Sequence, residues 1–256
     1  MILFPYKDDN PTRSFSLVNW CFIAGNLWVF FVYQFPLEEK EQMAYFSNFG
    51  FIPFTFTKQL TPFSIQGATW EWTTIFTSMF SHGGILHLLG NMHFLYLFGD
   101  NVEDAMGKVR YFFFFLLCGV AATFAQLYVD PESKIPMVGA SGAISGVIAG
   151  YLLVYPRANI RVFYWFLILI GTIHLPAYLI LGFWVFEQII ALPESMRSVG
   201  GIAIAAHLGG FAAGIILTPL FKQKKINLFQ KANSRAFSRK VRKLSLIHIS
   251  EPTRPY

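Results

Sequence analysis

The chain has 256 residues, of which 54% are hydrophobic and only 13% are charged. Soluble globular domains carry about a quarter charged residues, so the composition excludes an ordinary soluble protein and predicts a helical protein that crosses a membrane several times. The net charge of +6 does not indicate a nucleic-acid partner, because nine of the 20 Lys and Arg residues crowd into residues 222–243. Such a cluster is typical of a basic tail on an anionic lipid surface.

Six apolar segments approach the roughly 20 residues that a bilayer core requires of a helix. We therefore expect an all-α polytopic bundle of six spans over residues 15–220, preceded by a cytoplasmic N-terminus at residues 1–14. Residues 161–174 are assigned to the membrane interface or the side of the bundle, and a seventh span is the alternative. The expected spans are residues 15–35, 84–100, 109–128, 139–155, 175–192 and 200–220.

Basic residues in the connecting segments are distributed unequally over the two sides. If the N-terminus is inside, 15 Lys and Arg residues lie inside and four lie outside. Positive charge marks the cytoplasmic side, so we expect both termini in the cytoplasm and an even number of spans. The first outer connection, residues 36–81, is long, aromatic and weakly charged. This predicts a partly membrane-embedded loop or short interfacial helices.

Polar side chains inside the expected spans indicate function, because they are costly in lipid. His87 and Asn91 share one face of the second span at a spacing of four residues. Ser141 lies in the first turn of the fourth span, and His207 lies about two turns into the sixth. These three spans run from outside to inside, so a rise of 1.5 Å per residue places all four groups within roughly 10 Å of the outer surface.

A serine and a histidine at one depth suit nucleophilic acyl transfer, with Ser141 as nucleophile and His207 as the base that takes its proton. His87, Asn91 and backbone N–H groups at the start of the fourth span could bind the oxyanion. No Asp or Glu lies at that depth, which favours a Ser–His dyad over a triad. Each residue also has a structural interpretation, since small residues such as Ser141 commonly line helix contacts in membranes.

Four separated segments, SHGGILHLLGNM, FGDNVEDAMG, GASG and AHLGGFAAG, resemble in this order the rhomboid family of intramembrane serine proteases. The resemblance covers about residues 10–220. It implies that Ser141 is the nucleophile and His207 the general base. It also implies that His87 and Asn91, with the Ser141 backbone N–H, form the oxyanion site.

The same resemblance assigns structural roles to several other positions. Gly139 and Gly142 belong to the nucleophile motif, whereas Gly210 and Gly214 would pack the sixth helix against the fourth. Glu103 matches a polar network near the cytoplasmic side, and the stretch from residue 175 resembles a mobile fifth helix. Two positions depart from the family pattern: Ser145 replaces an aromatic residue that stacks on the catalytic histidine, and WEWTT around Trp72 replaces a Trp-Arg pair in the first outer loop.

The resemblance implies an endopeptidase that cleaves single-span transmembrane proteins near the outer end of their helix, through an acyl-enzyme. No metal is expected, because no carboxylate or cysteine joins the histidines at ligand spacing, and no cofactor is implied. We expect a multi-pass protein of the bacterial inner membrane. The alternative is a catalytically inactive relative that binds membrane clients. A solute channel is disfavoured because no internal repeat is apparent.

Two segments follow the expected membrane domain. Residues 221–243 are predicted to be a basic cytoplasmic tail with anionic lipid as its partner, and a partner-binding helix is the alternative. Residues 244–256, LSLIHISEPTRPY, lack periodicity and resemble a translated sequencing adapter. We interpret this last segment as an artefact and exclude it from the fold.

Overall fold

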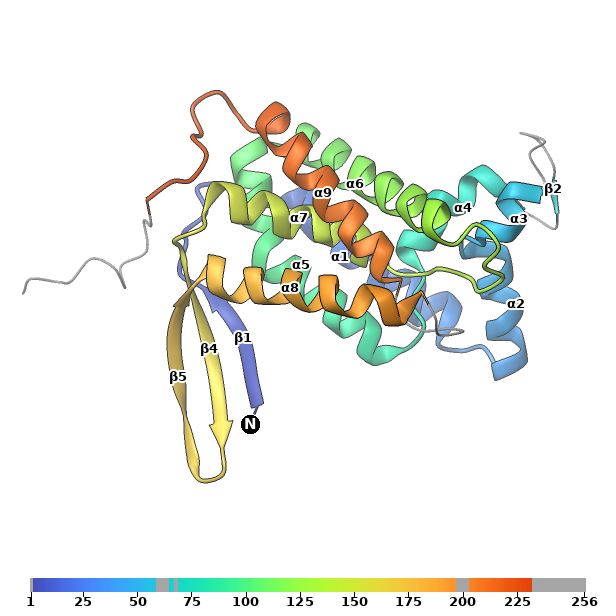
Figure 1. The fold of residues 1–256 in the computed structure, drawn as a ribbon, viewed down its shortest axis with the longest axis horizontal. Helices are drawn as coiled ribbons and strands as arrows, with labels where there is room; N and C mark the ends of the chain where they lie inside the picture. Colours follow the sequence, from blue (N-terminus) through green and yellow to red (C-terminus); the bar gives the residue numbers. More distant parts are fainter. Residues whose placement is uncertain (1, 59–64, 67–68, 197–202, 232–256) are drawn as a thin grey trace, which may run out of the picture.

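The computed structural model describes residues 2–58, 65–66, 69–196 and 203–231, and it is mainly helical (Figure 1). A helix stands where each of the six spans is expected. The first of them, α1, continues directly into the π-helical segment η1. The bounds are α1 Leu17–Trp28, η1 Val29–Gln34, α5 Ile85–Met106, α6 Lys108–Val129, α7 Ser141–Val154, α8 Ala177–Ser195 and α9 Ile204–Phe221.

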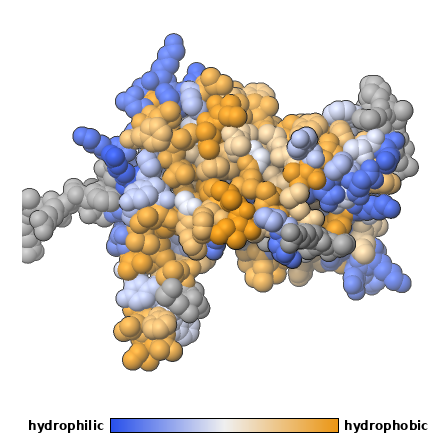
Figure 2. All heavy atoms as spheres, in the orientation of Figure 1, coloured by the Kyte–Doolittle hydropathy of each residue, from blue (hydrophilic) through white to orange (hydrophobic). Residues whose placement is uncertain are grey.

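Four helical segments in the described part of the chain are long and apolar enough to cross a membrane: α1 with η1, α6, α8 and α9. The other two differ for identifiable reasons. Helix α5 has 22 residues but includes polar and acidic side chains, and α7 is apolar but only 14 residues long. Figure 2 shows apolar side chains over the middle of the molecule and polar side chains gathered towards its two ends. The protein is therefore a multi-pass membrane protein.

Helix α7 lies in the middle of the bundle and packs against α5, α6 and α9 (Figure 1). Small residues let α9 approach its backbone closely. A Cβ atom at Gly214 would lie 2.7 Å from the Cα of Gly146, and a Cβ at Gly210 would meet the carbonyl group of Gly142. The two helices can keep this separation only while glycine occupies these positions.

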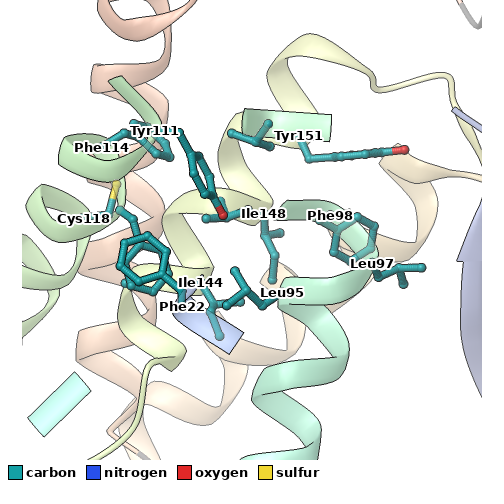
Figure 3. Close-up of a cluster of buried hydrophobic side chains, with 14 of the residues drawn as sticks. Phe22, Leu95, Leu97, Phe98, Tyr111, Phe114, Cys118, Ile144, Ile148 and Tyr151 are labelled. Atoms are coloured by element: carbon teal, nitrogen blue, oxygen red, sulfur yellow. The ribbon is translucent and has the colours of Figure 1, made fainter. Parts of the chain in front are cut away.

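An apolar core fixes the other side of α7 (Figure 3). Phe22 of α1 stacks on Phe115 of α6 with ring centroids 4.1 Å apart, and Phe98 of α5 meets Tyr151 of α7 edge to face. Each such ring buries a large apolar area, and pairs of rings prefer stacked or edge-to-face arrangements. The core thus holds α1, α5, α6 and α7 in one arrangement.

The apolar stretch after α7 forms a β-hairpin of β4 (Asn159–Phe166) and β5 (Leu169–Pro176). Strand β1 (Ile2–Asp8) pairs antiparallel with β4 and completes a sheet of order β1-β4-β5. The predicted all-α fold is wrong here, and so is the alternative of a seventh span. Aromatic and β-branched residues favour strands, and Leu167, at a φ of 54°, lies in the turn that divides the stretch.

Residues 36–81, the expected first outer connection, contain several short helices. They are α2 (Glu39–Phe49), α3 (Pro53–Lys58), α4 (Glu71–Thr77) and the 3-10 turn η2 (Ser78–Phe80), with the short strands β2 (Ile65–Gln66) and β3 (Thr69–Trp70) between α3 and α4. Phe51 exchanges two backbone hydrogen bonds with Met137, at 3.0 and 2.8 Å. This connection therefore supports the loop that leads into α7.

The tail expected at residues 221–243 is described only as far as residue 231, and residues 244–256 lie outside the described part. Its first ten residues pack on the helix ends. The backbone N–H of Gln223 donates to Ala105 O at the end of α5, and that of Phe229 donates to Leu153 O at the end of α7. This part of the tail belongs to the folded structure.

Candidate active site

Ser141 is the first residue of α7, and the backbone before it has an unusual conformation. Gly139 has a φ of 118°, and its N–H donates to Ser78 O at 2.8 Å. A Cβ atom at residue 139 would lie 2.8 Å from His87 Nε2 and 3.4 Å from Asn91 Nδ2. Glycine is required here for both reasons, since other residues rarely adopt this φ and would collide with the polar pair of α5.

His207 of α9 contacts Ser141 although 66 residues separate them in the chain. The distance between His207 Nε2 and Ser141 Oγ is 2.8 Å, which is a hydrogen bond. The close packing of Gly210 and Gly214 on α7 sets this distance, because His207 lies one turn before Gly210 on the same helix. The positions expected as nucleophile and base are thus in direct contact.

Helix α8 covers the other side of the His207 ring. Gln188 Oε1 lies 2.7 Å from His207 Nδ1, and the Trp184 ring lies 6.0 Å from the imidazole with a tilt of 34°. Sequence reasoning missed both residues. A signal was present, because Gln188 is an amide inside an expected span and follows Trp184 by four residues, so the two share one face of the helix.

Ser145, the departure from the family pattern, does not lie open beneath His207. Its side chain is fully buried, and Oγ donates a hydrogen bond of 2.7 Å to the carbonyl oxygen of Ser141. The aromatic ring next to the histidine comes from Trp184 on α8 instead of from α7. In the family pattern the stacking ring is on the helix of the nucleophile, which is α7 here. In this protein the ring beside His207 is on α8.

His87 and Asn91 of α5 face the same space as Ser141. The Gly83 N–H donates to His87 Nδ1 at 3.4 Å, so a neutral His87 carries its proton on Nε2, which faces the Gly139 backbone. Asn91 is 7% exposed, and its Nδ2 has no hydrogen-bond partner among the described residues. Buried donors are nearly always paired, so this amide is available to an acceptor that enters from the cavity.

A cavity of about 620 Å³ joins these groups. Its lining includes the polar residues Ser141, His207, His87 and Asn91 and the apolar residues Trp184 and Met79. A space of this size accommodates a short extended segment of polypeptide or a drug-sized molecule. All four polar side chains that the sequence placed at one depth line it.

The other histidines in the described part of the chain lie apart from Ser141. His93 Nε2 is 2.6 Å from Pro5 O, and His174 lies 3.8 Å from Asp9 in the sheet region. His82 is buried in the loop before α5, where Gln34 holds its backbone through two hydrogen bonds of 3.0 Å. Within the described ranges, no group of three or more His, Cys, Asp or Glu residues could hold a metal ion.

Glu103 forms the polar network expected at the opposite end of α5. Its carboxylate accepts hydrogen bonds from the backbone N–H groups of Val18 and Asn19, at 3.2 and 2.7 Å. N–H groups in the first turn of a helix have no partner within that helix. Glu103 of α5 therefore caps the N-terminus of α1. Tyr111 OH and Asn19 Oδ1 extend the network at 2.8 Å.

The chain is similar to known proteins over more than half of its length. The profile of the rhomboid domain matches residues 69–224. YdcA of Bacillus subtilis strain 168, named as a candidate rhomboid protease, is 29% identical over 166 residues, which cover 65% of this chain and 75% of YdcA. Rhomboid-like protein 11 of Arabidopsis thaliana chloroplasts is 29% identical over 162 residues, or 59% of this chain and 53% of the relative.

A mitochondrial relative extends the match. The human presenilin-associated rhomboid-like protein is 25% identical over 198 residues, which are 75% of this chain and 45% of that protein. The chain thus spans about half the length of the chloroplast and mitochondrial relatives. The helical membrane fold and the matched domain define a polytopic membrane protein with a rhomboid domain. The chain belongs to the rhomboid family, which includes both proteases and members named rhomboid-like.

Proposed function

We propose that this protein is an intramembrane serine endopeptidase that cleaves transmembrane segments of membrane proteins. The observation that carries the proposal is the 2.8 Å contact between His207 Nε2 and Ser141 Oγ, at the wall of a cavity that also exposes the unpaired Asn91 amide. Nucleophile, base and oxyanion donors are the parts that acyl transfer needs. Rhomboid membership supports the reaction at the level of the family.

The geometry suggests the following reaction. His207 Nε2 takes the Ser141 hydroxyl proton while Oγ attacks the substrate carbonyl carbon, and the oxyanion that forms accepts hydrogen bonds from His87 Nε2, Asn91 Nδ2 and the Ser141 N–H. The peptide C–N bond then breaks as His207 returns the proton to the leaving amine. Water, activated by His207, hydrolyses the acyl-enzyme and restores Ser141.

Substrate and membrane placement belong to the same proposal. The six expected spans cross the inner membrane of a bacterium with both termini in the cytoplasm, and residues 15–220 form the protease domain. The substrates are single-span proteins, cut near the outer end of their helix. Helix-breaking or small residues should favour cleavage, because a helix hides its amides in internal hydrogen bonds. The tail that begins at residue 221 meets anionic lipid.

The test uses purified protein in detergent and a panel of fluorogenic transmembrane substrates, with mass spectrometry of the products. We expect cleavage by the wild type and none by Ser141→Ala or His207→Ala. Full activity of Ser141→Ala would refute the assignment. A serine-reactive fluorophosphonate separates the alternative of an inactive client-binding relative, since such a protein would leave Ser141 unlabelled.

A further inference from the structure

Helix α8 presents one face to the bundle, and that face ends at His207. Ala177 and Leu181 are buried, and Trp184 and Gln188 follow in the next two turns and are half-buried. These spacings of four, three and four residues form a continuous stripe on a helix. The neighbouring residues Phe186 and Glu187 are exposed. Gln188 thus belongs to the inward face of α8 and not to its lipid side.

The rest of α8 is weakly enclosed. Of the most apolar 18-residue stretch of α8, 11% is buried inside the protein. The corresponding share is 33% in each of the other three spanning segments, α1 with η1, α6 and α9. Near the middle of α8, Trp184 and Gln188 both contact His207 of α9. The orientation of the His207 ring therefore depends on α8 as well as on its contact with Ser141.

The hydrogen bond from α8 also selects the tautomer of the imidazole. The Gln188 carbonyl oxygen can only accept, so His207 Nδ1 must carry the proton that it donates across 2.7 Å. A neutral imidazole has one N–H, which leaves Nε2 unprotonated and able to accept the Ser141 hydroxyl proton. If the amide were turned round, its NH₂ would donate to Nδ1, and a protonated Nε2 could not act as the base.

We propose that Gln188 is a positioning residue that holds His207 in the tautomer able to take the proton of Ser141. This inference rests on the proposed protease function. The amide does the task that a carboxylate performs in a catalytic triad, without the cost of an ionised group inside the membrane. Because Gln188 lies on α8, the base is competent only while the middle of α8 rests against α9.

Three substitutions separate positioning from packing. Gln188→Met keeps the length of the side chain but removes the acceptor, Gln188→Glu keeps an acceptor, and Glu187→Gln is the control on the exposed neighbouring position. We expect kcat to fall about tenfold in Gln188→Met with KM nearly unchanged, since one hydrogen bond is lost. Glu187→Gln should match the wild type. A wild-type kcat in Gln188→Met at an unchanged melting temperature would overturn the proposal.

The Gln188→Glu variant provides the decisive pH profile. A carboxylate next to Nδ1 stabilises the protonated imidazolium, so activity persists near neutral pH while the acid limb of kcat against pH moves to higher pH. A role in packing alone predicts no such movement. An unchanged acid limb in Gln188→Glu would contradict the proposal even if Gln188→Met proved too unstable to measure.

The tautomer can be observed without catalysis. In protein labelled with ¹⁵N-histidine, we expect the His207 signals to show a protonated Nδ1 and an unprotonated Nε2, assigned by their loss in His207→Ala. Gln188→Met should give a mixture of tautomers. A proton on Nε2 in the wild type would refute the inference. If instead the wild type shows the expected tautomer but neither cleaves substrates nor reacts with fluorophosphonate, the proposed function fails and the positioning contact stands.

Discussion

Asn91 shows how much of this site one residue can reveal. A buried amide in a membrane helix has to bond to something, and its Nδ2 has no partner in the described part of the chain. The spacing of four residues from His87 is sufficient to place both side chains on one face of a helix. The spacing could not show that this face lies near Ser141. The structure shows it, because His87, Asn91 and Ser141 line one cavity.

Asn91→Ala should lower kcat by about 10² to 10³, the usual effect of losing an oxyanion donor, while the folded protein keeps its stability. The amide is unpaired in the free protein, so its removal breaks no internal hydrogen bond through Nδ2 within the described part of the chain. The measurement is kcat on a fluorogenic transmembrane substrate together with a melting curve. A variant that loses stability but keeps kcat would show that Asn91 serves the fold and not the reaction.

A second prediction for a single residue concerns Gly139. Gly139→Ala should abolish cleavage and destabilise the protein, because φ is 118° and the new Cβ would press on His87 and Asn91. Gly182→Ala is the matched control, since a Cβ at this position of α8 meets no described atom within 4 Å. Thermal unfolding and cleavage of both variants provide the comparison. Equal behaviour of the two would count against the strain argument.

At the scale of elements, the contact of α7 with α9 decides whether Ser141 and His207 meet. The sequence indicated close packing through the small residues of each helix. It could not give the register in which they pack, and register determines whether Nε2 lies 2.8 Å or a full turn from Oγ. The role of α8 was not predicted. It depends on the contact between Gln188 and the imidazole of His207, which only the folded structure shows.

Gly214→Ala should test the helix contact directly. The added methyl group would lie 2.7 Å from Gly146 Cα, so α9 must move away from α7. Overpacking of this kind costs about 1–3 kcal/mol, and the displaced His207 should also reduce kcat. Chemical denaturation and kinetics on the same sample measure both effects. If activity survives a clear loss of stability, the glycine contact does not set the distance between base and nucleophile.

The sheet is attached to the bundle through a buried carboxylate of β1. Asp8 Oδ2 accepts hydrogen bonds from Tyr151 OH at 2.8 Å and Asn101 Nδ2 at 2.9 Å. Burial raises the pKa of Asp8 to about 7, and the nearby charges of Asp100 and Asp9 act in the same direction. The protonated form is thus favoured in the folded state. Its contribution to stability is complete below about pH 4 and is lost as the pH rises through about 7.

Asp8→Asn should therefore be more stable than the wild type at pH 8, by several degrees in melting temperature, and the difference should shrink towards pH 5. Asparagine keeps an oxygen that accepts from Tyr151 and Asn101, but it carries no charge. Melting curves of the two proteins across this range isolate Asp8 from other titrating groups. A difference that is constant with pH, or that grows on acidification, would contradict the assignment.

On the scale of the whole molecule, the apolar middle and polar ends in Figure 2 match a protein that spans a bilayer. Composition and charge distribution were sufficient to predict this. They also predicted a tail but not that its start is folded. The hydrogen bonds from Gln223 to α5 and from Phe229 to α7 tie residues 222–231 to the helix ends.

Two truncations should distinguish the folded part of the tail from the rest. A chain that ends after Lys231 should keep its melting temperature and its cleavage activity, because the described contacts remain. A chain that ends after Phe221 should melt several degrees lower, since it loses the backbone bonds to Ala105 and Leu153. Differential scanning fluorimetry in detergent measures both. Identical melting of the two chains would show that this packing contributes nothing.

The sequence by itself determined the class of membrane protein, the positions of six helices, and the four polar residues that line the cavity. Those properties depend on local composition, helical periodicity and charge bias, which the chain carries residue by residue. Only the tertiary structure decided that residues 159–176 form a hairpin paired with the N-terminus, and that Gln188 and Trp184 hold His207. Pairing partners far apart in sequence depend on packing and register, and neither leaves a periodic signal in a single chain.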